Sequence, residues 1–96
     1  MEPRDMLPQA EILAQLAEEA AELAQAALKL RRALDGHNPT LLSVPTAKHG
    51  LSEEIADVRV CLGQLDINEG EIKAIEAQKH LRWIVRLEAA RAEMEE

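Results

Sequence analysis

The chain has no Phe and no Tyr, and Trp83 is its only aromatic residue. Its apolar residues are mainly Ala, Leu, Ile and Val. Sheets favour aromatic and β-branched residues, whereas this mixture is typical of closely packed helices. An Ala-rich core in a chain of 96 residues is small, and burial stabilises by only ~25 cal/mol per Å² of apolar area. We therefore expect a homodimer or homotetramer to supply the missing buried area.

Cysteine is nearly absent, and long apolar runs are missing. Cys61 is the single cysteine, so no intrachain disulfide can form, which suits a reducing compartment. Pro3, Arg4 and Asp5 stand where a secretory signal peptide would have its apolar stretch. No apolar run approaches the ~20 residues that span a bilayer. We therefore expect a cytoplasmic protein with no membrane partner.

Basic residues are outnumbered by acidic ones. The chain has 11 Lys and Arg against 18 Asp and Glu, which gives a formal net charge of −7. Binding a nucleic acid requires a basic surface, so this balance argues against DNA or RNA as the main partner. It does not exclude a nucleotide, because cations bound to clustered acids can in turn hold phosphate.

Apolar residues recur at three- and four-residue spacing along most of the chain, which is typical of helices. Pro8 suits a first helical turn, Gly36 a helix end and Asn68 a later helix cap. Pro45 and Gly50 are expected to prevent a helix around them. The sequence predicts a lead-in at 1–7, helices at 8–34, 52–65 and 68–90, a loop at 35–50 and a frayed end at 91–96. The expected fold is all-α: a single domain over 1–96, with two long helices flanking a shorter one, completed by oligomerisation.

One acidic phrase occurs twice. Residues 16–23 read Leu-Ala-Glu-Glu-Ala-Ala-Glu-Leu, and residues 51–58 read Leu-Ser-Glu-Glu-Ile-Ala-Asp-Val. Side chains three residues apart share a helix face, at about 5–6 Å between Cβ atoms. Each phrase therefore pairs two acids: Glu19 with Glu22, and Glu54 with Asp57. If the two helices pack antiparallel, the four carboxylates converge.

Four converging carboxylates repel one another unless a cation neutralises them. Ligation by oxygen alone favours Mg²⁺ or Mn²⁺ over zinc or copper, and Mg²⁺ commonly takes substrate phosphates as further ligands. A di-iron bundle would need Glu-x-x-His motifs, but Lys79 lies three residues after Glu76 and His80 comes one position too late. A single Glu-x-x-Glu pair is usually a solvated helix face. The repetition is what indicates a metal site, and the adjoining Glu18 and Glu53 either support it or are surface charges.

Together the two phrases resemble the MazG-type all-α NTP pyrophosphohydrolases, whose relatives include dimeric dUTPases, dCTP pyrophosphatases and phosphoribosyl-ATP pyrophosphatase. The resemblance covers roughly residues 11–87 and is greatest with the short, single-domain MazG-like proteins of bacteria and prophages. Val60-Cys61 stands where phosphoribosyl-ATP pyrophosphatase would show Tyr-His. That departure argues against this particular relative.

The resemblance implies a Mg²⁺-dependent enzyme that cleaves an NTP or dNTP between its α and β phosphates, giving a monophosphate and pyrophosphate. It assigns the metal to Glu19, Glu22, Glu54 and Asp57. The metal would position the triphosphate and activate the attacking water. One of the outer acids, Glu18 or Glu53, would orient or deprotonate that water.

The family also has a basic motif on a later helix that contacts phosphate. The matching stretch is Lys79-His80-Leu81-Arg82-Trp83. Lys79, Arg82 and Arg86 share one helix face at i, i+3 and i+7, and the resemblance implies that they bind substrate. The family often has Lys-Asn at the first two positions, so the role of His80 stays open. The alternative is a solvated face that pairs with neighbouring acids.

The preferred base is not specified. Gln15, one turn before the first metal pair, is a candidate hydrogen-bond partner for a base or sugar. Trp83 either stacks on a base or anchors the core or an interface, and the lack of other aromatic residues favours the anchor. His37, Asn38 and His49 lie in or beside the expected loop, where a histidine is more often simply exposed. Cys61 is expected to be a buried packing residue.

Two non-catalytic functions are the alternatives. A helical oligomeric interaction module would carry the acids only as surface charge along sustained heptads, and the expected loop at 35–50 interrupts any such repeat. A nucleotide-binding or partner-binding protein of the same fold would work without turnover. The complete set of four acids argues against that second alternative.

Overall fold

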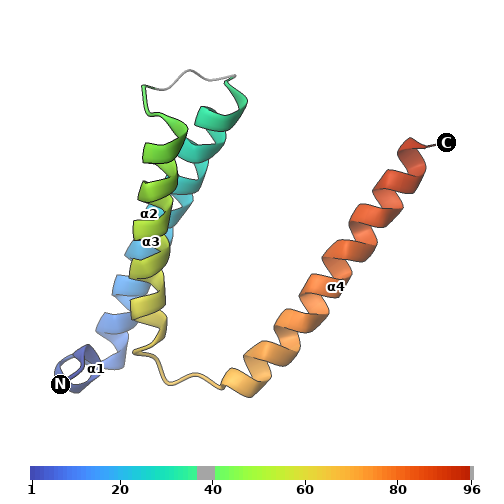
Figure 1. Cartoon of the computed structure of the whole chain (residues 1–96). Coiled ribbons are helices and arrows are strands. Elements are labelled where there is room, and N and C mark those ends of the chain that lie inside the picture. The colour runs from blue at the N-terminus through green and yellow to red at the C-terminus, as the bar shows by residue number, and fades with distance from the viewer. Residues whose placement is uncertain (37–40, 96) are drawn as a thin grey trace. The chain divides into compact units, whose positions relative to one another are not determined.

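The computed structural model describes residues 1–36 and 41–95, and over these residues helices joined by short turns are the only regular secondary structure. The elements are α1 (Pro3–Met6), α2 (Gln9–Asp35), α3 (Val44–Leu62) and α4 (Glu69–Met94), as shown in Figure 1. The all-α prediction is confirmed for the described part of the chain, as is the order of two long helices flanking a shorter one. The chain divides into two units, Met1–Leu65 and Asp66–Glu96, which we describe separately.

α2 begins and ends within one residue of the predicted bounds, 8–34. Pro8 is its N-cap residue, and Gly36 is its C-cap residue with φ at 69°. This left-handed conformation favours glycine, because a Cβ would be strained there. The Gly36 amide donates to the Arg32 carbonyl oxygen at 3.0 Å and closes the last turn.

α3 begins earlier than expected, at Val44, so the prediction of a loop extending to residue 50 is wrong. Ser43 caps the helix: its Oγ accepts from the Thr46 amide at 3.3 Å. Pro45 lies in the first turn, where a missing N–H leaves no helical hydrogen bond unmade. Gly50 lies inside the helix and only weakens it, since interior glycine costs about 1 kcal/mol. His37 and Asn38 lie outside the described residues, and so does any role predicted for them.

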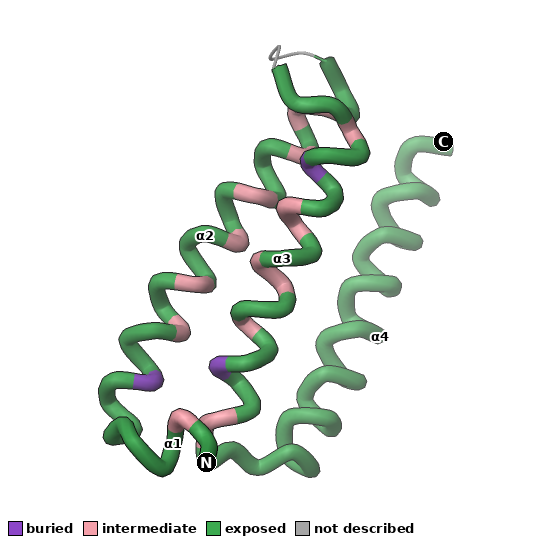
Figure 2. Tube along the Cα trace, turned by 60° about the vertical axis from the view of Figure 1, so that its left-hand side comes forward, coloured by how far each residue is buried: buried purple, intermediate pink, exposed green. Residues whose placement is uncertain are grey.

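α2 and α3 run antiparallel and form a helical hairpin, with the less exposed residues along one seam (Figures 1 and 2). On α2 the seam positions are Ile12, Leu16, Glu19, Leu23, Ala26 and Leu30, and on α3 they are Val44, Ala47, Leu51, Glu54, Val58 and Cys61. These alternating steps of three and four residues are the heptad pattern of packed helix pairs. Each row is apolar except for one glutamate, Glu19 in α2 and Glu54 in α3.

The N-terminal lead-in forms the short helix α1, which is bound to the far end of α3. The Arg4 amide donates to Gln64 Oε1 at 3.1 Å, and Gln64 Nε2 donates to Glu2 Oε2 at 3.0 Å. α3 itself ends at Leu62, before the expected Leu65, with Gly63 as its cap. These contacts close the open end of the hairpin.

α4 begins at the predicted cap: Asn68 Oδ1 accepts from the Glu71 amide at 3.0 Å. The helix continues to Met94, beyond the expected end at Ala90, and Arg91 Nε lies 3.3 Å from Glu95 Oε1. No residue of α4 is buried (Figure 2). Among residues 1–36 and 41–95, no helix combines the length and apolar character needed to cross a bilayer.

Candidate metal centre

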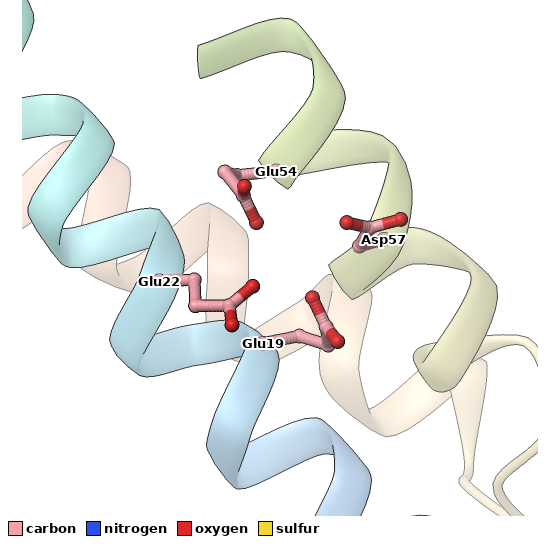
Figure 3. Close-up of side chains that lie close together, drawn as sticks. All are labelled: Glu19, Glu22, Glu54 and Asp57. Carbon is pink, nitrogen blue, oxygen red and sulfur yellow. The ribbon is translucent and has the colours of Figure 1, made fainter. Parts of the chain in front are cut away.

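The two halves of the repeated phrase meet across the hairpin. Glu19 and Glu22 extend from α2, and Glu54 and Asp57 extend toward them from α3 (Figure 3). One carboxylate oxygen from each of the four lies within 4.8 Å of the others. The i, i+3 spacing and the antiparallel packing of α2 and α3 together produce this acidic cluster. The sequence prediction that these four acids converge is therefore realised in the structure.

The cluster is not a fully solvated surface patch. Glu19 and Glu54, at seam positions, are half-buried, whereas Glu22 and Asp57 are exposed. The Oε2 atoms of Glu19 and Glu54 are inaccessible to solvent and accept no hydrogen bond from any described residue. A carboxylate oxygen removed from water without a donor or cation is destabilising. Two such oxygens in one cluster favour neutralisation, by a proton or by a bound cation.

Gln15 holds Glu19 in position. Gln15 Nε2 donates to Glu19 Oε1 at 2.8 Å, from one turn earlier on α2. This leaves Oε2 of the same carboxylate turned inward without a donor. The predicted contact of Gln15 with a base or sugar stays a prediction, while its contact with Glu19 has the i, i+4 spacing at which side chains on one helix meet.

The environment of Glu19 disfavours its charged form. The hydrogen bond from Gln15 lowers the pKa of Glu19, but desolvation and the negative charges of Glu22 and Asp57 raise it. The net effect is a pKa above the ordinary value of 4.5. A bound cation would have the opposite effect, because it favours the carboxylate. The cluster is therefore more compatible with a cation than with four free acids.

The donor set fits a hard divalent cation. All four ligands are carboxylate oxygens, the type that Mg²⁺ and Mn²⁺ prefer. Their mutual separation of at most 4.8 Å is somewhat larger than twice the Mg²⁺–oxygen distance of about 2.0–2.1 Å, so small side-chain movements would bring all four onto one ion. The described residues supply no imidazole or thiolate to this group, which argues against a zinc or copper site.

The outer acids lie outside the acidic cluster. Glu53 is directed to His49: its Oε1 lies 2.9 Å from His49 Nε2. Glu18 is exposed on α2. Their predicted roles toward an attacking water stay predictions, and the partner of His49, left open by the sequence, is Glu53.

The predicted phosphate-binding residues are all on α4. Lys79, Arg82 and Arg86 are exposed along this helix. Because α4 belongs to the second unit, their position relative to the acidic cluster is not described, and their contact with substrate stays a prediction. Trp83 is also exposed, at 61%, so it is not a core anchor within the described chain.

Cys61 is buried in the seam, as expected of a packing residue. Desolvation raises the pKa of its thiol, and the charges of Glu19 and Asp57 raise it further. A protonated thiol is a poor nucleophile and a poor metal ligand. Cys61 is therefore an apolar neighbour of the acidic cluster and is not one of its ligands.

A pocket of about 510 Å³ adjoins the acidic cluster, and the sequence did not reveal it. We call it the hairpin pocket; its walls include Glu22, Gln25, Lys29, Leu42, Thr46, His49, Glu53 and Glu54. Two of these, Glu22 and Glu54, also belong to the cluster. Glu22 and Lys29 are seven residues apart and share one face of α2, and Thr46 and Glu53 likewise share one face of α3. Only the pairing of α2 with α3 brings these two faces together.

No family model, curated protein or solved structure matches this chain. The site itself offers three chemical features: a hard-cation ligand set, an adjoining polar pocket and an acid that is held by a histidine. Together they suit the binding of a small anionic substrate through a metal.

Proposed function

We propose that this chain is a Mg²⁺-dependent nucleoside triphosphate pyrophosphohydrolase of the MazG-like type. The observation that carries the proposal is the pair of solvent-inaccessible carboxylate oxygens, Oε2 of Glu19 and of Glu54, without donors in an otherwise apolar seam. Apolar residues at these positions would pack better. Retaining glutamates there makes sense if a cation occupies the cluster.

Each acid then has a defined task. Glu19, Glu22, Glu54 and Asp57 hold the cation, and Gln15 fixes the orientation of Glu19. When bound, Mg²⁺ supplies charge neutralisation for the triphosphate and a more acidic water. Glu53 accepts the proton of the attacking water and is held for that task by His49, with Glu18 as the alternative base. The resemblance supports cleavage between the α and β phosphates, to a monophosphate and pyrophosphate.

Oligomerisation is part of the proposal. α4 carries several large apolar side chains that are exposed: Ile72, Ile75, Trp83, Ile84 and Leu87. Only Ile12, Ala47 and Cys61 are buried among the apolar residues of the described chain. A homodimer or homotetramer that covers α4 would supply the missing core, and Lys79, Arg82 and Arg86 would then reach the triphosphate.

The test is a panel of NTPs and dNTPs incubated with the protein and Mg²⁺, with release of monophosphate and pyrophosphate measured. Glu54→Gln and Asp57→Asn should reduce turnover at least a hundredfold while leaving the circular dichroism spectrum unchanged. Glu11→Gln, an exposed acid on α2, is the matched control and should keep full activity. Absence of turnover with every substrate, despite Mg²⁺ binding, would instead favour a nucleotide-binding protein of the same fold.

The non-catalytic interaction module makes the opposite prediction. If the acids were only surface charge, Mg²⁺ would not raise the melting temperature, and Glu54→Gln would change neither metal binding nor stability. A metal titration followed by calorimetry separates the two functions before any substrate is known.

A further inference from the structure

The hairpin pocket is continuous with the acidic cluster. Glu22 and Glu54 form part of both, and from them the pocket extends along α2 to Lys29 and along α3 to Thr46. Its volume of about 510 Å³ falls in the range of about 300–1,000 Å³ that is typical of small-molecule sites. A ligand bound to a cation on the cluster would therefore extend into this pocket.

Lys29 is the cation that this pocket offers to a ligand. Of the acids in the pocket walls, Glu53 is already held by His49 at 2.9 Å, and Glu22 and Glu54 belong to the acidic cluster. Lys29 itself forms no salt bridge with any residue in the described part of the chain. A lysine ammonium beside a pocket with no carboxylate partner is suited to an anionic ligand, because its three donors can bind phosphate oxygens.

The position of Lys29 on α2 directs it toward the cluster. It follows Glu22 by seven residues, which is two helical turns or about 10.5 Å along the axis. Side chains on a helix lean toward its N-terminus, so the ammonium group is carried back toward the carboxylates. The cluster and Lys29 thus mark the two ends of one elongated site for an anionic ligand.

Thr46 adds a donor on the opposite wall. Ser43 Oγ donates to Thr46 Oγ1 at 2.9 Å, so the hydroxyl oxygen of Thr46 is already an acceptor. A hydroxyl that accepts one hydrogen bond can still donate its own proton, and phosphate oxygens are acceptors. The cap of α3 therefore orients a hydroxyl for the same kind of ligand that Lys29 favours.

We propose that the hairpin pocket binds the terminal phosphates of the substrate, with Lys29 pairing with them, while the phosphate next to the nucleoside lies over the acidic cluster. This inference rests on the proposed function. The pocket walls contain no Phe, Tyr or Trp, and their one ring, the imidazole of His49, is paired with Glu53. The walls carry charge of both signs. The site thus recognises the length of the phosphate chain, and the base lies outside this pocket.

The experiment measures binding of inorganic tripolyphosphate in the presence of Mg²⁺ to the full chain by titration calorimetry. Lys29→Ala should weaken this binding at least tenfold, and Lys29→Arg should restore most of it. Lys48→Ala is the matched control, because Lys48 lies on α3 outside the pocket walls and should change binding less than twofold. Binding of a nucleoside monophosphate with Mg²⁺ should be unaffected by Lys29→Ala.

Three results overturn the inference: no binding of tripolyphosphate to the unaltered protein, equal binding by Lys29→Ala, or weakening of the monophosphate alone, which would place the nucleoside in the pocket. The proposed activity is judged separately by the nucleotide panel. Turnover that is lost in Asp57→Asn but independent of Lys29 would support the enzyme and reject this pocket assignment. Tripolyphosphate binding that depends on Lys29, without turnover of any nucleotide, would support the pocket assignment and reject the proposed enzyme.

Discussion

Glu54 is an acidic residue at a position that the packing of α2 against α3 would otherwise assign to an apolar side chain. Its Oε2 is solvent-inaccessible and has no donor among the described residues. Replacement of such a group by an apolar side chain of similar size often stabilises a protein. A carboxylate at this position therefore opposes the stability of the metal-free fold, and the size of that effect can be measured.

We expect Glu54→Leu to increase the free energy of unfolding of the metal-free protein by about 1 kcal/mol, because the buried carboxylate is removed. The same change should abolish stabilisation by Mg²⁺. Thermal melts with and without Mg²⁺ measure both effects, and Glu11→Leu is the control at an exposed position of α2. If Glu54→Leu is less stable than the unaltered protein without metal, then the carboxylate of Glu54 does not destabilise the metal-free fold.

The raised pKa of Glu19 predicts that the stability of the metal-free protein depends on pH. The ordinary value, 4.5, applies to the unfolded chain. The folded protein holds the proton more firmly, so this contribution to stability is fully present below pH 4.5 and is lost as the pH rises through the folded pKa. The melting temperature of the metal-free protein should fall over that window.

Glu19→Gln should remove this part of the pH dependence, since the amide does not titrate. Mg²⁺ should also remove it at neutral pH, because the cation replaces the proton as the group that neutralises Glu19. Melting curves collected across the acidic range, with and without Mg²⁺, test both statements. An unchanged pH profile in Glu19→Gln would assign the dependence to another group.

At the scale of elements, the start of α3 depends on one side chain. Ser43 Oγ accepts from the Thr46 amide, which would otherwise lack an intrahelical partner. Ser43→Ala should therefore cost about 1 kcal/mol of stability. Urea unfolding measures the loss. Ser52→Ala is the control, since Ser52 donates to the Lys48 carbonyl oxygen inside the helix and should change stability by less than about 0.5 kcal/mol.

The ends of the elements show what the sequence could and could not predict. Gly36 and Asn68 act locally, so their residue types were sufficient to predict a helix end and a helix cap. Pro45 was interpreted as a breaker because its effect depends on its position: inside a helix it disrupts, but two residues after the cap Ser43 it fits the first turn. The Ser43 cap therefore turns a residue type that usually ends a helix into part of the start of α3.

The site was predictable to the same degree. The four ligands follow from the helical spacing of the repeated phrase and from antiparallel pairing. The seam positions of Glu19 and Glu54 were visible in the heptad steps from Ile12 and from Val44, had these been extended through acidic residues. The hairpin pocket was not predictable, because Lys29 and Thr46 are distant in sequence and meet only when α2 pairs with α3. The placement of α4 is not set by any local pattern.

At the scale of the whole molecule, the thin core of the chain determines what to expect. Few apolar residues are buried, and the large apolar residues of α4 are exposed. If copies of the chain cover α4, the melting temperature should rise with protein concentration, because association stabilises only the folded state. Ile75→Lys should abolish both the assembly and this concentration dependence.

Sedimentation velocity measures the assembly and should give the mass of two or four chains for the unaltered protein. Lys73→Ala, an exposed substitution on the same helix, is the control and should preserve that mass. A monomer whose melting temperature does not change with concentration would contradict the proposed oligomer and the burial of α4 within it.

The antiparallel pairing of two nearly identical phrases gives the acidic cluster an approximate two-fold symmetry axis. The axis exchanges α2 with α3, so that Glu19 corresponds to Glu54 and Glu22 to Asp57 (Figure 3). The surroundings break this symmetry: the hairpin pocket, with Lys29 and Thr46 in its walls, lies on the side of Glu22 and Glu54. If the proposed polyphosphate binds, this symmetric ligand set inside asymmetric surroundings would make one direction of the phosphate chain more favourable than the other.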